Sequence, residues 1–113
     1  MGIKTAQVFK SDGATHHGWL VHCPACGYPH LFDERWGFNG DHEAPTFTGS
    51  MLVHGVHTPA AETANGQPYD RPRCHSHLVA GVWHYCDDCE HPHKLQQLQA
   101  PDWDDRHKSR EGA

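Results

Sequence analysis

The sequence predicts a small, mostly β protein built from short antiparallel sheets and hairpins. Its apolar residues occur in short runs separated by Gly, Pro, Asn and Asp, a pattern typical of strands joined by turns. Apart from one short candidate near the C-terminal end, no stretch shows the apolar periodicity of a helix. With 113 residues, the chain is long enough for one small domain.

The apolar core should be thin. Leu, Ile, Val and Phe make up about 15% of the residues, below the roughly 20% under which a chain risks disorder. Disorder also requires a high net charge, and the net charge here is only -5. Four Trp, three Tyr and four Phe add bulky apolar surface. We therefore expect a folded chain that needs a further stabilising element, such as a metal, disulfides or a partner.

Two strands are expected near the N-terminus, one on each side of a turn. Ala6–Phe9 and Trp19–His22 are the apolar runs, and Ser11–Gly13 between them has turn chemistry. Residues 39–40 are an Asn-Gly pair, and both residue types tolerate the positive φ of a tight turn. Met51–Val53 is the next strand candidate.

The second half of the chain is expected to contain an exposed loop and a hairpin. Residues 58–73 include three Pro, three Ala and an Asn-Gly pair, which favour a loop. Leu78–Val79 and Val82–Tyr85 flank the pair Ala80-Gly81, and this arrangement predicts two antiparallel strands.

For Pro92–Gln99, helix and strand both stay open, so a small α+β fold is the alternative to a mostly β one. A proline suits the first helical position and two leucines are spaced i, i+3, but the same residues could form a strand. Residues 104–113 are mostly charged or small and are expected to form a flexible tail. This leaves residues 1–103 as a single β-rich domain.

Composition and charge exclude several classes of protein. No run approaches the 18 apolar residues that indicate a transmembrane helix, and residues 1–6 lack the apolar segment of a secretory signal. We therefore expect a cytoplasmic protein, in which Cys pairs serve as metal ligands or redox groups before disulfides. The negative net charge does not favour nucleic-acid binding, which normally requires a basic surface.

Two Cys-x-x-Cys pairs predict a zinc site. Cys23 and Cys26 can reach one ion from a tight turn, and Gly27 permits the backbone to fold back. Cys86 and Cys89 repeat the spacing, and each pair directly follows a strand candidate. Two such turns facing one another form a tetrahedral four-cysteine site of the zinc-ribbon type. The long separation between the pairs is acceptable because loop-closure entropy grows only logarithmically.

Other zinc-ligand residues lie beside the second pair. The predicted hairpin brings residues 74–77 near residues 86–89, so the alternative ligands are Cys74, His75, His77 and His91. One zinc ion is expected. For the fourth ligand, Cys86 ranks slightly ahead of Cys74, because the position of Cys74 depends on the hairpin register.

Several motifs together resemble a family of small uncharacterised proteins found in phage and prophage genomes. The shared elements are Cys23-Pro-Ala-Cys26-Gly27, Trp36-Gly-Phe38-Asn39-Gly40-Asp41, Pro45-Thr46-Phe47-Thr48-Gly49-Ser50, Cys74-His75-Ser76, Gly81, Asp88-Cys89-Glu-His91 and Pro101-Asp102-Trp103. This family is a domain of unknown function that genome annotation often calls "ammonia monooxygenase". That label does not fit, because the enzyme of that name is a membrane copper complex.

The resemblance implies two refinements of the site and the fold. Family members usually have an apolar residue where Cys86 stands and a Phe where His77 stands. This favours Cys74 or His75, with Cys89 or His91, as partners of the first Cys pair. In the family, the stretch before Pro101-Asp102-Trp103 is a strand, which favours a strand for the segment that ends at Gln99.

The expected function is that of a phage-type accessory protein in the bacterial cytoplasm, with a structural zinc ion. It would act by binding a host or phage protein. The alternative is a small zinc hydrolase, with three protein ligands, a bound water and Asp87, Asp88 or Glu90 as the base. The ligand count distinguishes the two, because four protein ligands leave no position for water.

Overall fold

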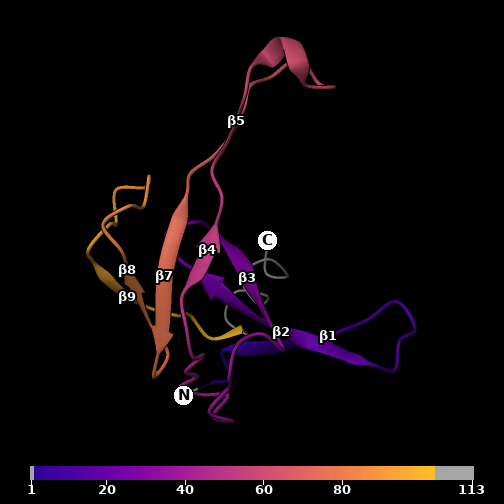
Figure 1. Cartoon of the computed structure of the whole chain (residues 1–113), viewed down its shortest axis with the longest axis vertical. Helices are drawn as coiled ribbons and strands as arrows, with labels where there is room; N and C mark the ends of the chain where they lie inside the picture. The colour runs from indigo at the N-terminus through magenta and orange to yellow at the C-terminus, as the bar shows by residue number, and fades with distance from the viewer. Residues whose placement is uncertain (1, 104–113) are drawn as a thin grey trace.

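The structure is a computed structural model that describes residues 2–103. Within these residues, the strands form three antiparallel sheets (Figure 1). The first sheet has the order β1-β2-β3, the second β4-β7-β8-β9 and the third β5-β6. The strands are β1 (Thr5–Phe9), β2 (His16–Cys23), β3 (Tyr28–Asp33), β4 (Met51–Val53), β5 (Val56–Thr58), β6 (Tyr69–Arg71), β7 (Cys74–Val79), β8 (Val82–Tyr85) and β9 (Gln97–Gln99). A short 3-10 helix, η1 (Ala60–Glu62), lies between β5 and β6. The mostly β prediction is confirmed.

The predicted hairpin between β7 and β8 is present and closes on two residues with positive φ. Ala80 and Gly81 have φ values of 50° and 79°. Positive φ at both central residues matches the tight turns that suit the twist of paired strands. The register pairs Val79 with Val82 and Ser76 with Tyr85. The side chains of β7 alternate between buried and more exposed positions, as successive residues of a strand point to opposite faces of the sheet.

A small aromatic core packs the first sheet against the second. The ring of Phe32 on β3 stacks on Phe47 at 4.2 Å and on Trp83 at 5.8 Å between centroids. Trp83 on β8 is fully buried and donates from its indole nitrogen to the carbonyl of His22 on β2 at 2.8 Å. Each aromatic ring buries a large apolar area, so these rings form a main part of the thin core.

The two ends of the described chain lie side by side. Lys4 Nζ contacts the carboxylate of Asp102 at 2.7 Å, and the backbone N–H of Trp103 donates to the carbonyl of Ile3 at 2.8 Å. The predicted flexible tail, residues 104–113, lies outside the described residues.

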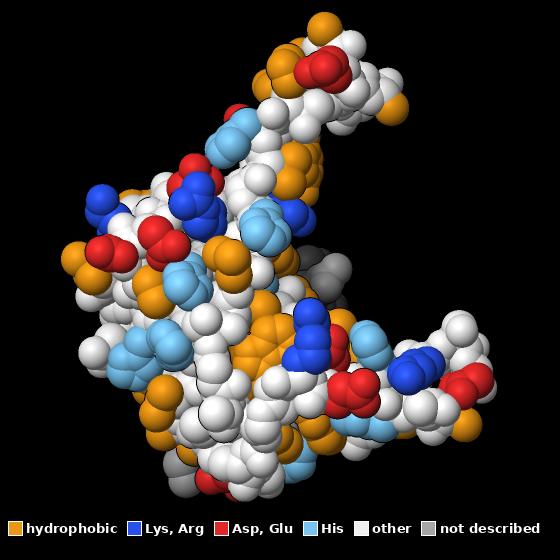
Figure 2. Space-filling view, viewed as in Figure 1, with side chains coloured by type: hydrophobic (Ala, Val, Ile, Leu, Met, Phe, Trp, Pro, Cys, Tyr) orange, Lys and Arg blue, Asp and Glu red, His pale blue; other side chains and the backbone are white. Residues whose placement is uncertain are grey.

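The segment predicted as an exposed loop is partly a paired arm, which corrects the sequence prediction. β5 and β6 pair with Val56 opposite Arg71 and Thr58 opposite Tyr69. The arm projects from the rest of the molecule, as does the β1–β2 hairpin (Figure 2). The Pro and Gly content correctly indicated the turn at the tip. It did not reveal the pairing, because three-residue strands have no periodicity to detect.

The ambiguous segment before Ala100 forms a turn and then a strand. β9 pairs with β8 in the register Val82–Gln99 and His84–Gln97. Leu95 has a φ of 65° and is 73% exposed, so it cannot contribute an apolar helical face. Across residues 2–103, no helix is long and apolar enough to cross a membrane.

Candidate metal centre

The turn between β2 and β3 brings two thiols together. Cys23 is the last residue of β2, and its carbonyl accepts hydrogen bonds from the backbone N–H of Cys26 at 3.2 Å and of Gly27 at 2.9 Å. Gly27 has a φ of 80°, which a residue with a side chain rarely adopts. The tight turn expected from the Cys-Pro-Ala-Cys-Gly motif is therefore present.

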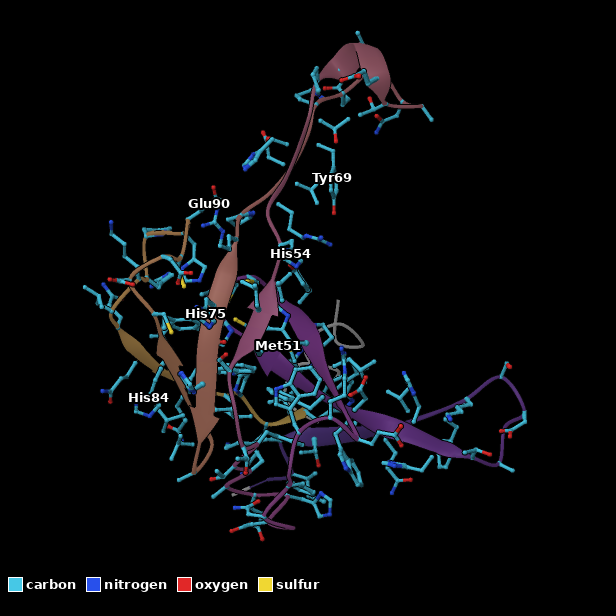
Figure 3. The ribbon with its side chains drawn as sticks, viewed as in Figure 1. Met51, His54, Tyr69, His75, His84 and Glu90 are labelled. Atoms are coloured by element: carbon cyan, nitrogen blue, oxygen red, sulfur yellow. The ribbon has the colours of Figure 1, made fainter. Side chains whose placement is uncertain are left out.

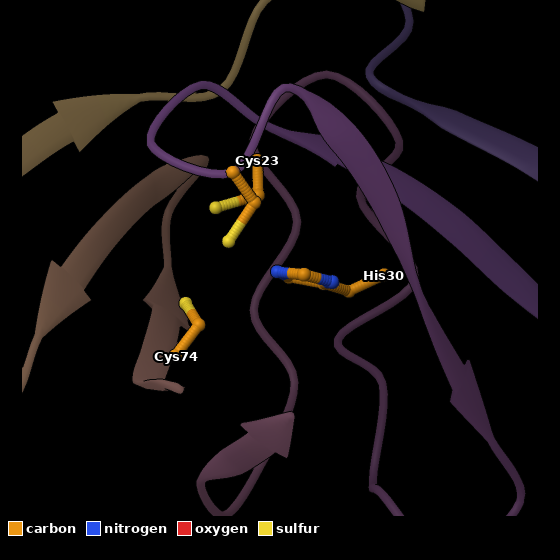
Figure 4. A group of neighbouring side chains, drawn as sticks. Cys23, His30 and Cys74 are labelled. Carbon is orange, nitrogen blue, oxygen red and sulfur yellow. The ribbon is translucent and has the colours of Figure 1, made fainter. Parts of the chain in front are cut away.

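Two residues from other strands complete a buried group around this turn (Figure 4). Cys74 begins β7 in the second sheet, and His30 lies in the middle of β3. One ligand atom from each of Cys23, Cys26, His30 and Cys74 lies within 4.8 Å of all the others. In Figure 4 the side chains of Cys23, His30 and Cys74 converge from different parts of the fold. We call these four residues the buried centre.

Contacts among the three thiols of the buried centre shift their pKa values in opposite directions. The Cys26 and Cys74 thiols hydrogen-bond to the sulfur of Cys23 and lower the pKa of Cys23 far below its usual range. The same contacts raise the pKa of Cys26 to about 12 and raise that of Cys74 strongly. These shifts favour ionisation of Cys23 and oppose ionisation of Cys26 and Cys74, which a bound cation would favour. Such a cluster is suited to a divalent metal that binds thiolates.

His30 contributes a buried nitrogen atom that needs a partner. Its ring interacts with the Cys23 thiol and lowers the pKa of that thiol, while its buried Nε2 makes no hydrogen bond of standard geometry among residues 2–103. Buried polar atoms normally have a partner, so an unsatisfied imidazole nitrogen beside three cysteines fits a metal ligand.

A second buried group shares one residue with the buried centre. Ligand atoms of Cys74, Cys89 and His91 lie within 4.8 Å of one another. The sulfur of Cys89 accepts a hydrogen bond from the backbone N–H of His75 at 3.3 Å and donates to the His75 carbonyl at 3.2 Å. Burial lowers the pKa of His91, whose Nε2 makes no hydrogen bond among residues 2–103.

Cys86 lies in a third group, on the other side of the second sheet. It is near His75 and Asp88, and the three ligand atoms lie within 4.8 Å of one another. Neighbouring residues on a strand point to opposite faces, so His75 faces away from the buried Cys74. His77 also faces outward and is exposed.

The structure thus separates the two predicted Cys pairs. Cys23 and Cys26 lie with Cys74 and His30, whereas Cys89 groups with Cys74 and His91, and Cys86 groups with His75 and Asp88. The predicted ligand set of Cys23, Cys26, Cys86 and Cys89 stays a prediction.

His30 is the residue that the sequence reasoning missed. A usable signal was present, because His30 follows Cys26 on the next strand and alternates with Phe32, which is fully buried. Two residues separated by one position on a strand share a face, so an inward Phe32 implies an inward His30.

Comparison of the chain with protein-family models, with curated proteins and with solved structures finds no match in any of the three. The Cys and His clusters are compatible with metal binding, and their geometry carries the functional argument.

Proposed function

We propose that the chain binds one structural zinc ion through Cys23, Cys26, His30 and Cys74. The observation that carries this proposal is the mutual approach of four buried or half-buried ligand atoms to within 4.8 Å. In a tetrahedral zinc site with Zn–S bonds of about 2.3 Å, two sulfur atoms are about 3.8 Å apart. The ligands therefore need only small adjustments to close on zinc.

The ion would join the two larger sheets. Cys23 and His30 belong to the first sheet, whereas Cys74 belongs to the second. A metal bound only by the folded chain stabilises it by its binding free energy, which supplements the thin apolar core.

A closed site supports a binding function over catalysis. Four protein ligands leave no open position for a water molecule, which a zinc hydrolase requires. Two of the three carboxylates considered as bases are also engaged elsewhere. Glu90 accepts a hydrogen bond from the backbone N–H of Arg73 at 2.7 Å, which lowers the pKa of Glu90, and Asp88 lies 3.0 Å from His75.

The accompanying proposal is a phage-type accessory protein that binds a host or phage protein in the bacterial cytoplasm. The two projections of the molecule support it, because each exposes a large ring: Phe9 is 48% and Tyr69 52% exposed. A photo-crosslinking residue at Tyr69 should capture one defined protein in bacterial cells, whereas the same residue at exposed Leu95 should not. Equal capture at both positions would contradict this proposal.

Zinc content and thermal stability test the metal proposal. Desalted protein should retain about one zinc ion per chain, and a strong chelator should lower the melting temperature or unfold the protein. The X-ray absorption spectrum of the bound zinc should show sulfur and nitrogen neighbours and no water oxygen. A metal-free protein with an unchanged melt would contradict the proposal, and a bound water would favour the hydrolase.

A further inference from the structure

The outer face of the second sheet carries a separate cluster of metal-binding residue types. His75 on β7, Cys86 just after β8, and Asp88 in the following turn bring a nitrogen, a sulfur and a carboxylate oxygen within 4.8 Å of one another. Figure 3 shows His75 and His84 on the adjacent strands β7 and β8. None of the three residues belongs to the buried centre, so the cluster is independent of the proposed structural zinc.

The backbone holds these three residues in place. The N–H of Cys86 donates to the carbonyl of His75 at 2.8 Å, which extends the β7–β8 ladder by one step. The N–H of Cys89 donates to the carbonyl of Cys86 at 3.4 Å and closes the turn that contains Asp88. The cluster is therefore preorganised by backbone contacts.

His75 and Asp88 lie slightly closer together than two ligands of one metal ion would. His75 Nδ1 lies 3.0 and 3.2 Å from the two oxygens of Asp88. With zinc bonds of about 2.0–2.2 Å to nitrogen and oxygen, tetrahedral ligand atoms lie about 3.3–3.5 Å apart. A cation could replace the present hydrogen bond with little movement of either side chain.

The charge around Cys86 favours a cation. Asp87 and Asp88 precede Cys89 in the same turn, and both carboxylates are exposed. Thiolate, imidazole and carboxylate together prefer a borderline transition cation to Mg²⁺ or Ca²⁺, which take oxygen ligands alone.

We propose that His75, Cys86 and Asp88 form a second, solvent-accessible site for zinc or a similar divalent transition cation, with an open coordination position. The half-exposed side chains, 29% for His75 and 43% for Asp88, leave room for a water molecule or a ligand from another molecule. Three ligands at a solvent-exposed position hold a cation less tightly than four buried ones. This site therefore exchanges its ion readily.

Cobalt titration of the zinc-loaded protein tests the second site. With the buried centre already filled, added Co²⁺ should produce thiolate-to-cobalt charge-transfer absorption that depends on Cys86. Cys86→Ser should abolish this absorption, and Asp88→Asn should weaken cobalt binding at least tenfold. Asp87→Asn is the matched control, because Asp87 is an exposed carboxylate of the same turn outside the cluster.

The outcomes separate this proposal from the structural one. All three variants should keep the tightly bound zinc and the wild-type melting temperature. Charge-transfer absorption that survives in Cys86→Ser would overturn the second site, as would equal effects of Asp87→Asn and Asp88→Asn or a wild type without the absorption. A wild-type protein without tightly bound zinc would contradict only the proposed buried centre. The second site would still be tested, because the difference in charge-transfer absorption between wild type and Cys86→Ser would still be measurable.

Discussion

The phenolic oxygen of Tyr85 lies 3.1 Å from the sulfur of Cys23, although 62 positions separate the two residues in the sequence. This contact links β8 of the second sheet to the last residue of β2 in the first. Burial and the charge of Cys23 raise the pKa of Tyr85, so its hydroxyl stays protonated and can donate to the thiolate. The sheets therefore meet at a sulfur atom that we propose as a zinc ligand.

Tyr85→Phe should weaken zinc binding without abolishing it. Partners that hydrogen-bond to metal ligands typically contribute about 10–100-fold in affinity. Competition with a chromophoric chelator measures this change. Tyr69→Phe is the control, because Tyr69 is exposed on the projecting arm. Unchanged affinity in Tyr85→Phe would show that the hydroxyl does not support the ligand.

Cys74→Ser and Cys86→Ser should differ sharply in zinc content. Cys74 is fully buried in the proposed centre, whereas Cys86 lies in the outer group. We expect Cys74→Ser to lose the tightly held zinc and the wild-type melt, and Cys86→Ser to keep both. The opposite result would support the ribbon-like pairing of Cys86 with Cys23 and Cys26.

Cys23→Ser and Cys26→Ser should each prevent stable folding, because loss of a ligand forfeits much of the metal's binding free energy. Circular dichroism and zinc analysis of the purified variants measure the effect. A normally melting Cys26→Ser protein that retains its zinc would exclude Cys26 as a ligand.

His30→Gln tests the residue that only the structure revealed. Glutamine keeps much of the side-chain volume but is a poor zinc ligand, so tightly bound zinc and the melting temperature should both fall. His84→Gln on β8 is the control, since His84 is only half-buried and belongs to none of the three groups within residues 2–103. Equal behaviour of both variants would remove His30 from the centre and favour Cys89 or His91.

The ion pair between Lys4 and Asp102 should make stability depend on acidity. The contact with Lys4 lowers the pKa of Asp102 from its usual 3.8. A lowered folded-state pKa means that the stabilisation is present above about pH 4 and is lost as the pH falls through the folded-state value. Thermal melts should therefore show a difference between wild type and Asp102→Asn at neutral pH that shrinks below about pH 4. A constant difference would contradict this origin.

The sequence alone determined the local features of this protein. Short apolar runs between turn residues indicated strands, and Ala80-Gly81 indicated the hairpin that the structure contains. The Cys-Pro-Ala-Cys-Gly motif indicated the turn that holds Cys23 beside Cys26. Each of these features depends on residues within a few positions of one another, so the sequence alone is enough to predict it.

Only the tertiary structure decided which distant residues meet that turn. The sequence offered both Cys74 and Cys86 as candidates to join it. Packing of the second sheet buries Cys74, whereas the next residue on the strand, His75, faces outward together with Cys86. The same packing turned His30 inward. The pairing of β5 with β6 along the projecting arm also became visible only in the structure. A strand offers two faces that differ by one position, and which face is buried depends on the sheet that packs against it.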